Sequence, residues 1–265
     1  MSGSTLSIPD MKQTSFRPKH ILAIGATSAI AEHCVRLWAA DGATTISLIG
    51  RDQQKLLRMH DDLRARFPLV QLTCQVCADF VDPVEIEAQL EKAFASQVPD
   101  MVLIAHGDLP DQQACQTDLS VARRAIDING LSPVLWAESV VRRFERVGHG
   151  CLGVIGSVAG DRGRQSNYVY GAAKGLVERY VQGLQHRLAG SAVRVSIIKP
   201  GPTATPMTAQ LQAQGQKMAP VQDVAGHIVK GLQAGKPVIY TPPIWFVIMM
   251  VIKHLPRFIF NRMKI

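Results

Sequence analysis

Two side chains near the middle of the chain have the types and the spacing that carbonyl–alcohol chemistry requires. Tyr170 and Lys174 lie four residues apart at the start of a helix-forming run, so both would point from one face of that helix. A neighbouring ammonium stabilises a phenolate, and Lys174 is therefore expected to lower the pKa of Tyr170 from its ordinary value of ~10. Such a tyrosine gives a proton to a carbonyl oxygen or takes one from an alcohol. The alternative is an ordinary tyrosine on a solvated helix face.

A hydroxyl upstream of this pair could hold the same substrate oxygen. Ser157 precedes Tyr170 by thirteen positions and follows the apolar run 151–156, so it is expected at the end of a buried strand. A strand end that faces the tyrosine helix would bring the three polar groups together.

Seven short apolar runs predict the strands that position these groups. They cover residues 20–25, 44–49, 70–78, 100–107, 151–156, 193–199 and 236–240, and helical patterns lie between them. This alternation predicts an α/β fold with a doubly wound, Rossmann-type parallel sheet of about seven strands. We expect a flexible extension at 1–18, one Rossmann domain at 19–242, and an amphipathic C-terminal helix at 243–265.

The first strand ends in a turn that suits a dinucleotide. Gly25 and the small residues 26–31 open a helix, whose N-terminal amides would meet a pyrophosphate. After the second strand, an acidic residue would favour NAD, whereas an arginine accommodates the 2′-phosphate of NADP. Arg51 directly follows Gly50, so NADP(H) is the preferred cofactor and NAD(H) the alternative. Asp52 is expected to cap the next helix.

These motifs together resemble the short-chain dehydrogenase/reductase family over residues 20–242. The resemblance rests on Ser157, the Tyr170-x-x-x-Lys174 pair, Asn129, Gly25 and the run from Pro200 to Thr205. It implies four catalytic residues, Asn129, Ser157, Tyr170 and Lys174, in which Lys174 also grips the nicotinamide ribose and Asn129 anchors a relay water. It further implies cofactor contacts from Gly25, Thr27, Ser28, Ile30, Arg51, Asp79, Phe80, Ala105, Gly107, Tyr170, Lys174, Pro200, Thr203 and Thr205. The alternative for Asn129 is a local hydrogen bond to the helix backbone.

The chain departs from the family pattern at two places. Ala29 and Ala31 replace glycines of the nucleotide turn. The fourth strand ends Ile104-Ala-His-Gly107 where the family has Asn-Asn-Ala-Gly, and His106 is expected either to touch substrate or to be a structural imidazole. Residues 207–217 would form a lid over the substrate.

Composition narrows the classes of partner. The net charge of the 265 residues is +8, but no nucleic-acid motif is present, so no nucleic acid is expected. Five cysteines do not make a disulfide framework, and the pair Cys74 and Cys77 is predicted to be core thiols rather than a metal site. The polar N-terminus lacks a secretory signal, which predicts a cytoplasmic protein.

Two arginines between the serine and the tyrosine suggest an anionic substrate. Arg162 and Arg164 would meet a phosphate, and the alternative is that both are solvated loop residues. This segment and the C-terminal tail resemble the branch of the family that reduces a 2-keto pentose to arabinose in decaprenylphosphoryl-arabinose synthesis for the cell wall. The resemblance implies a polyprenyl-phosphate-linked sugar substrate, a flavin-dependent oxidase as partner, and membrane association.

The tail itself predicts a helix that lies on a membrane. The nine apolar residues 244–252 are too few to span a bilayer, which needs ~20. Four cations follow them, so we expect peripheral binding to an anionic surface on the inner face of the cell membrane, with Trp245 at headgroup level and a break at Pro256. They are Lys253, Arg257, Arg262 and Lys264. The alternative is that the tail caps the core or a partner subunit in a homo-oligomer.

Other functions remain open from the sequence. One is reduction of a different membrane-soluble ketone or alcohol, such as a sterol or an acyl lipid. Another is a catalytically silent NAD(P)-binding interaction protein, against which the complete set of four catalytic residues argues.

Overall fold

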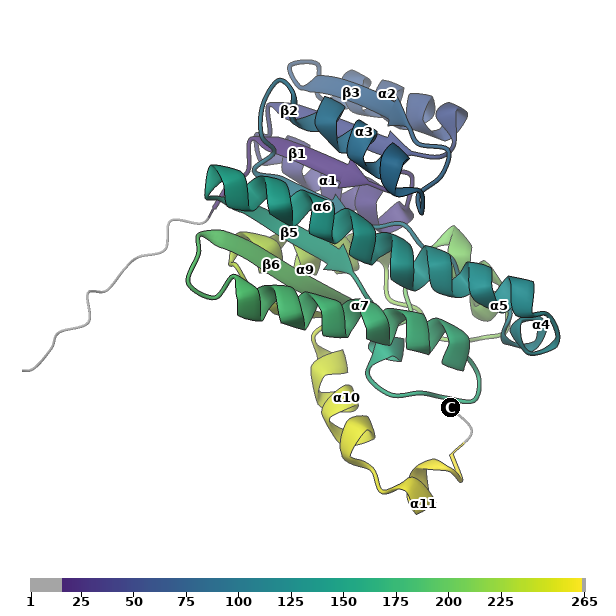
Figure 1. Ribbon diagram of the computed structural model, residues 1–265. Coiled ribbons are helices and arrows are strands. Elements are labelled where there is room, and N and C mark those ends of the chain that lie inside the picture. Colours follow the sequence, from purple (N-terminus) through teal and green to yellow (C-terminus); the bar gives the residue numbers. More distant parts are fainter. Residues whose placement is uncertain (1–15, 264–265) are drawn as a thin grey trace, which may run out of the picture.

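The seven predicted strands form one parallel sheet. A computed structural model describes residues 16–263, and the strand order is β3-β2-β1-β4-β5-β6-β7 (Figure 1). The strands are β1 His20–Ile24, β2 Thr45–Gly50, β3 Gln71–Val76, β4 Met101–Ile104, β5 Gly150–Ile155, β6 Val193–Pro200 and β7 Val238–Thr241. All six neighbouring pairs are parallel, so the predicted Rossmann-type sheet is confirmed.

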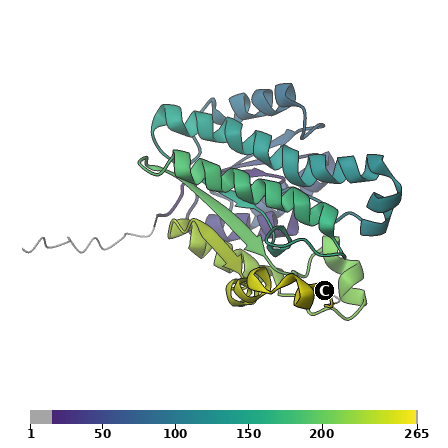
Figure 2. The ribbon, with the colours of Figure 1, turned by 60° about the horizontal axis from the view of Figure 1, so that its bottom comes forward.

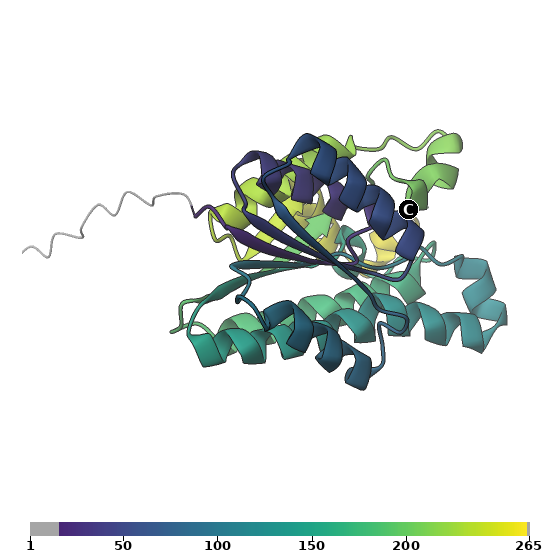
Figure 3. The ribbon, with the colours of Figure 1, turned by 90° about the horizontal axis from the view of Figure 1, so that it is seen from above.

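Helices cover both faces of the sheet, as Figure 3 shows from above. One layer contains α1 Ala29–Ala40, α2 Gln53–Arg66 and α9 Val221–Gln233, and the other contains α3 Pro83–Phe94, α6 Ser132–Val147 and α7 Tyr168–Arg187. Each layer packs its apolar stripe on a sheet face, where the large side chains Trp38 and Trp136 are at most 1% exposed. The central strands are buried on both faces, which explains their continuous apolar sequences.

The order of the strands creates the crevice for a ligand. The chain winds outward from β1 in one direction through β2 and β3, and in the other direction from β4 onward. The carboxyl ends of β1 and β4 therefore lie side by side, with Ile24 opposite Ile104 and the Ala105 amide donating to the Ile24 carbonyl at 2.8 Å. Ligands of open α/β sheets bind at such a switch point.

The predicted helix over 119–147 is interrupted at a functional position. It consists of α5 Leu119–Ile126, a π-helical turn η1 Asp127–Leu131, and α6, and a short helix α4 Gln112–Thr117 precedes it. A π turn inserts an extra residue into the helix and is frequent at functional sites. Here the turn carries Asn129, whose side chain is fully buried.

The C-terminal tail is two helices rather than one. Helix α10 covers Ile244–His254 and α11 covers Arg257–Phe260, with the predicted break at Pro256 (Figure 2). Proline lacks an amide hydrogen and clashes with the preceding turn. Within residues 16–263 no helix has the length and apolar character to cross a bilayer. Lys264 lies outside the described residues.

Three local expectations need correction or qualification. Phe16 packs under Arg194, whose guanidinium carbon lies 4.5 Å from the ring centroid, so the packed domain begins before residue 19. The rest of the predicted extension, residues 1–15, lies outside the described part.

Cys77 is buried as predicted, but Cys74 is exposed because it lies on the edge strand β3. The predicted lid contains a 3₁₀ turn η3 Pro206–Thr208 and a short helix α8 Ala209–Ala213.

Candidate active site

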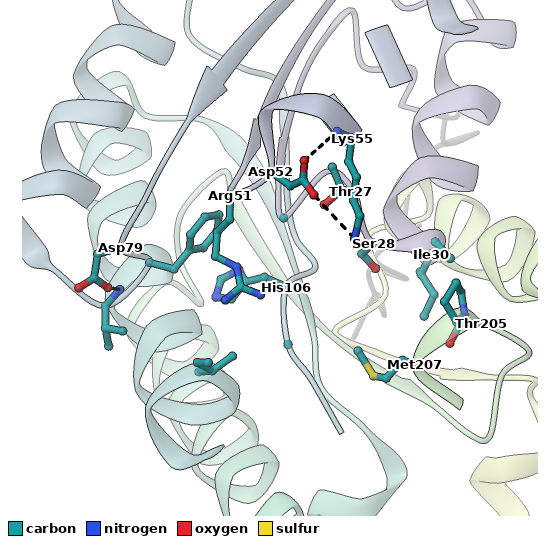
Figure 4. Close-up of a pocket in the computed structure, with 18 of the residues that line it drawn as sticks. Thr27, Ser28, Ile30, Arg51, Asp52, Lys55, Asp79, His106, Thr205 and Met207 are labelled. Atoms are coloured by element: carbon teal, nitrogen blue, oxygen red, sulfur yellow. Dashed lines mark hydrogen bonds and ion pairs between the residues drawn. The ribbon is translucent and has the colours of Figure 1, made fainter. Parts of the chain in front are cut away.

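A cavity of about 970 Å³ opens at the carboxyl ends of β1, β2 and β4 (Figure 4). It is lined by nine of the predicted cofactor residues, Gly25, Thr27, Ser28, Ile30, Arg51, Asp79, Phe80, Gly107 and Thr205. Ser28 is the N-cap of α1 and makes no side-chain capping bond, so unpaired amides of the first helical turn are available to an anion. The donors and the shape of this cavity fit a dinucleotide.

The turn that follows β1 is compact because Gly25 touches the exit of β4. Gly25 has a φ of +76°, and a Cβ built on it would lie 2.5 Å from the backbone nitrogen of His106. The imidazole of His106 is hydrogen-bonded to the Ser132 hydroxyl at 2.8 Å, and this hydroxyl donates to the Phe80 carbonyl at 2.6 Å. Burial lowers the pKa of His106 to about 3, and Lys174 and Arg51 act in the same direction. His106 is thus a neutral, structural imidazole that also forms part of the cavity wall.

Three basic side chains surround the end of the cavity at β2 and α2. Arg51 follows the strand, and Lys55 and Arg58 follow on the first turns of α2, where spacing of three places them on one face. Asp52 also lines this end of the cavity, and its carboxylate caps the helix as predicted, because it accepts from the Lys55 amide at 3.0 Å. Lys55 and Arg58 therefore add to the positive charge that Arg51 gives this end of the cavity. Figure 4 shows Lys55 beside Asp52.

Five predicted cofactor residues do not line the cavity: Tyr170 and Lys174, which are described below, and three residues at the strand ends. Ala105 is 6% exposed and pairs with β1, and Pro200 is the buried last residue of β6. Thr203 is 4% exposed, and its hydroxyl donates to the Gly201 carbonyl at 2.9 Å. These residues shape the strand ends, and Thr205 is the residue of that loop that reaches the cavity.

Ser157, Tyr170 and Lys174 meet next to Gly107; they do not line the cavity themselves, but Gly107 does. Ser157 follows β5 and caps a 3₁₀ turn, η2 Val158–Gly160, while Tyr170 and Lys174 occupy the first turns of α7. Lys174 is 3% exposed; its ammonium donates to the Ile155 carbonyl at 3.2 Å and lies 5.8 Å from the centroid of the Tyr170 ring. The sequence prediction that these side chains converge is confirmed.

The prediction that Tyr170 has a lowered pKa is wrong for this arrangement. Burial raises the pKa of Tyr170 to about 12, and the hydrogen bond with Ser157 offsets only part of that rise. Burial also lowers the pKa of Lys174 to about 8, because the ammonium is removed from water. At neutral pH the site therefore holds a protonated phenol, which is the form that donates a proton to a carbonyl oxygen.

Asn129 is joined to a carboxylate that the sequence analysis did not identify. Its amide nitrogen donates to Asp108 at 2.6 Å and to the Ala125 carbonyl at 3.0 Å, while its oxygen accepts from the Asp108 amide at 3.0 Å. The local bond to Ala125 is the alternative that the sequence had left open. A Cβ on Gly107 would lie 2.8 Å from Asn129 Oδ1 and 3.5 Å from Lys174 Nζ, so these groups are close neighbours.

The Asp108 carboxylate is expected to set the alkaline limit of activity. Its charge raises the pKa of both Lys174 and Tyr170, so its removal should make both groups lose their protons at lower pH. Asp108→Asn keeps an acceptor for Asn129 and removes only the charge. The alkaline limb of the kcat/KM profile for reduction should move down by about one pH unit. Asp111→Asn, which removes an equal charge from the cap of α4, should leave that limb in place; an unmoved limb in Asp108→Asn would contradict the role.

The two predicted substrate arginines face the C-terminal helices. Arg162 Nη1 donates to the carbonyls at the end of α10, Ile252, Lys253 and Leu255. Its guanidinium carbon lies 3.8 Å from the centroid of the Phe260 ring, and Arg164 reaches Met249 Sδ at 3.9 Å. Neither arginine lines the cavity. The structure gives both a packing role, and the guanidinium of Arg162 is already hydrogen-bonded.

A buried ionic group holds the loop that carries these arginines. Asp161 is bonded to Lys199 at the end of β6 and accepts from the Tyr240 hydroxyl at 2.8 Å. Lys199 also pairs with Glu178 of α7 at 2.6 Å. Burial opposes ionisation of Asp161, but the hydrogen bonds from Lys199 and Tyr240 hold its pKa below the ordinary value. The loop between Ser157 and Tyr170 is therefore tied to β6, β7 and α7 at once.

Comparison with known proteins agrees with this geometry. The sequence pattern of short chain dehydrogenases matches residues 19–216. The chain belongs to the short-chain dehydrogenase family. Its relatives include an uncharacterised oxidoreductase from the mprA 5′ region of Streptomyces coelicolor, 31% identical over 96% of this chain and 99% of that protein. An uncharacterised oxidoreductase of Mycobacterium tuberculosis (strain ATCC 25618 / H37Rv) is 30% identical over 92% and 96% of the two chains.

Solved structures share the fold of this short-chain dehydrogenase. A short-chain dehydrogenase from Sphingobium yanoikuyae in complex with NADPH superposes with a TM-score of 0.76 at 22% identity, covering 90% of this chain and 96% of that one. A single-substitution variant of the actinorhodin polyketide ketoreductase with NADPH gives 0.74 at 18% identity, covering 84% and 95%. The protein is an oxidoreductase of this family.

Sequence reasoning did not identify three charged residues near the site. Lys55 and Arg58 were identifiable in principle, because they share one helical face directly after Arg51. Asp108 carried no comparable signal, since nothing local indicates that it pairs with Asn129, 21 residues away.

Proposed function

We propose that this short-chain dehydrogenase is an NADPH-dependent reductase of a ketone. The observation that carries the proposal is the convergence of Ser157, Tyr170 and Lys174 next to Gly107. Gly107 lines the same cavity as the three cations Arg51, Lys55 and Arg58. The two NADPH complexes with the same fold support this choice of cofactor. When bound, the cofactor supplies the hydride that converts the ketone carbon to an alcohol.

The protein groups supply the proton and hold the oxygen. Ser157 donates a hydrogen bond to the carbonyl oxygen, and Tyr170, whose pKa is raised by burial, gives its proton as charge develops there. Lys174 holds its ammonium next to this position, where the charge stabilises the resulting phenolate. Asn129 and Asp108 keep Lys174 in a polar surrounding inside an otherwise apolar core.

The finer proposal is that the ketone is a 2-keto pentose carried on polyprenyl phosphate. It is supported by the resemblance of residues 156–174 and of the tail to reductases of decaprenylphosphoryl-arabinose synthesis, and by the net charge of +8. A flavin-dependent oxidase would then supply the keto substrate from the corresponding alcohol. Arg162 does not contribute to this argument, because it is bound to the end of α10.

Turnover of matched substrates tests the proposal. Purified protein would receive NADPH and a detergent-dispersed 2-keto pentose on a short polyprenyl phosphate, with a neutral acyl ketone of equal chain length as comparison. We expect kcat/KM at least ~10-fold higher for the sugar, which corresponds to one charge-assisted contact. A preference for the acyl ketone would favour the second candidate, reduction of another lipid ketone. Binding of NADPH without turnover of any ketone would indicate a silent interaction protein.

A further inference from the structure

The C-terminal segment has two faces with opposite surroundings. On α10, the side chains of Trp245, Ile248, Met249 and Ile252 face the protein, and Met249 is fully buried. The indole Nε1 of Trp245 occupies the space beside Gly201, where a Cβ on that glycine would overlap with it. Trp245 is therefore a packing residue, and its predicted position at headgroup level is wrong.

The opposite face is apolar and exposed. We name it the C-terminal apolar face, and it consists of Ile244, Phe246, Val247, Met250, Val251, Phe258 and Ile259, which are 41–66% exposed. At 3.6 residues per turn, the five members on α10 share one arc of about 160° around the helix. A soluble surface rarely gathers so many large apolar side chains, and such a patch marks an interaction site.

The segment is fixed to the catalytic loop. Arg162 donates to the carbonyls at the end of α10 and stacks on Phe260 of α11, so it joins both helices to the loop between Ser157 and Tyr170. Figure 1 shows α10 projecting from the sheet beside this loop, with α11 turned beneath it. The apolar face therefore has a defined orientation relative to the active site.

Charge decides between the possible occupants of this face. Lys253, Arg257 and Arg262 accompany it, and the described residues from 243 to 263 include no aspartate or glutamate. In a symmetric dimer formed through this face the same cations would oppose each other without acidic partners. An anionic bilayer surface offers an apolar interior for the exposed side chains and negative headgroups for the cations.

We propose that the C-terminal apolar face docks on an anionic bilayer and places the active-site loop at its surface. This inference rests on the proposed function for the substrate, because docking would present the enzyme to a ketone that stays in the membrane. Val247, Val251 and Phe258 would enter the boundary between headgroups and acyl chains, while the Phe246 ring, 5.7 Å from Tyr240 between centroids, packs against the protein. Each of the three cations would strengthen binding about fivefold.

Surface substitutions test the docking better than deletion of the tail, which would also remove Trp245 and Met249 from the core. The full chain would be sedimented with phosphatidylglycerol vesicles and with neutral phosphatidylcholine vesicles. Val247→Asp with Val251→Asp places two charges on the apolar face. Leu69→Asp with Val84→Asp makes the same change at two exposed positions elsewhere, one in the turn after α2 and one at the start of α3. Thermal unfolding and NADPH binding would show that each variant is folded.

We expect the wild type and the Leu69/Val84 variant to bind anionic vesicles on the order of 10-fold or more above neutral ones, and the Val247/Val251 variant to lose that binding. Equal sedimentation of the two aspartate variants would overturn the proposal. Loss of a dimer in Val247/Val251, with vesicle binding unchanged, would overturn it in favour of a second copy.

The assay also separates docking from the proposed function, because vesicle binding needs no ketone. Docking without reduction of any lipid ketone would reject only the proposed function. Reduction in detergent without docking would reject only this inference.

Discussion

Replacement of Tyr170 by phenylalanine is expected to lower kcat for ketone reduction by roughly 10²–10⁴-fold, the range for loss of a general acid. The substitution removes the hydroxyl that meets Ser157 and keeps the ring on α7. The protein should retain its unfolding temperature and its affinity for NADPH. Steady-state kinetics and quenching of NADPH fluorescence measure the two quantities separately.

A second tyrosine on the same helix provides the matched control. Tyr168 begins α7 and is 44% exposed, so Tyr168→Phe removes the same hydroxyl from a solvated position. Its kcat should stay near the wild-type value. Near-full turnover by Tyr170→Phe would show that the proton comes from another group and would remove the central residue of the proposed mechanism.

Replacement of Arg51 by alanine is expected to weaken NADPH binding by about 10- to 100-fold, since charge-assisted bonds contribute ~1.5–3 kcal/mol. Arg51 lies at the end of β2 on the cavity wall, where Lys55 and Arg58 add to the positive field. NADH lacks the 2′-phosphate, so its affinity should change little. Titration of both cofactors against wild type and variant gives the two ratios.

The control for Arg51 is an arginine of α2 that does not line the cavity. Arg64 is exposed near the end of α2, and Arg64→Ala removes one positive charge at a distance from the nucleotide. Its NADPH affinity should match that of the wild type. Equal weakening of NADPH and NADH in Arg51→Ala, or a wild type that prefers NADH, would contradict the contact with the 2′-phosphate.

The sequence by itself determined the fold and most of the residues around the active site. Apolar runs alternating with helical patterns are a local property of the chain, and they predicted seven parallel strands at nearly their observed bounds. The spacing of Tyr170 and Lys174 also follows from local geometry, because four residues make about one helical turn. Gly25 at the end of β1 and Arg51 at the end of β2 were identifiable because strand ends in this topology meet at one edge of the sheet.

Only the tertiary structure decided which charges face one another. Arg162 looked like a phosphate ligand from its position between Ser157 and Tyr170, but α10, some 90 residues further along the chain, supplies carbonyls that bind its guanidinium. The pKa of Tyr170 depends on how deeply the ring is buried and on Asp108, neither of which sequence spacing reveals. Periodicity reports the backbone conformation of a segment, whereas burial and pairing of charges depend on segments that meet only when the chain is folded.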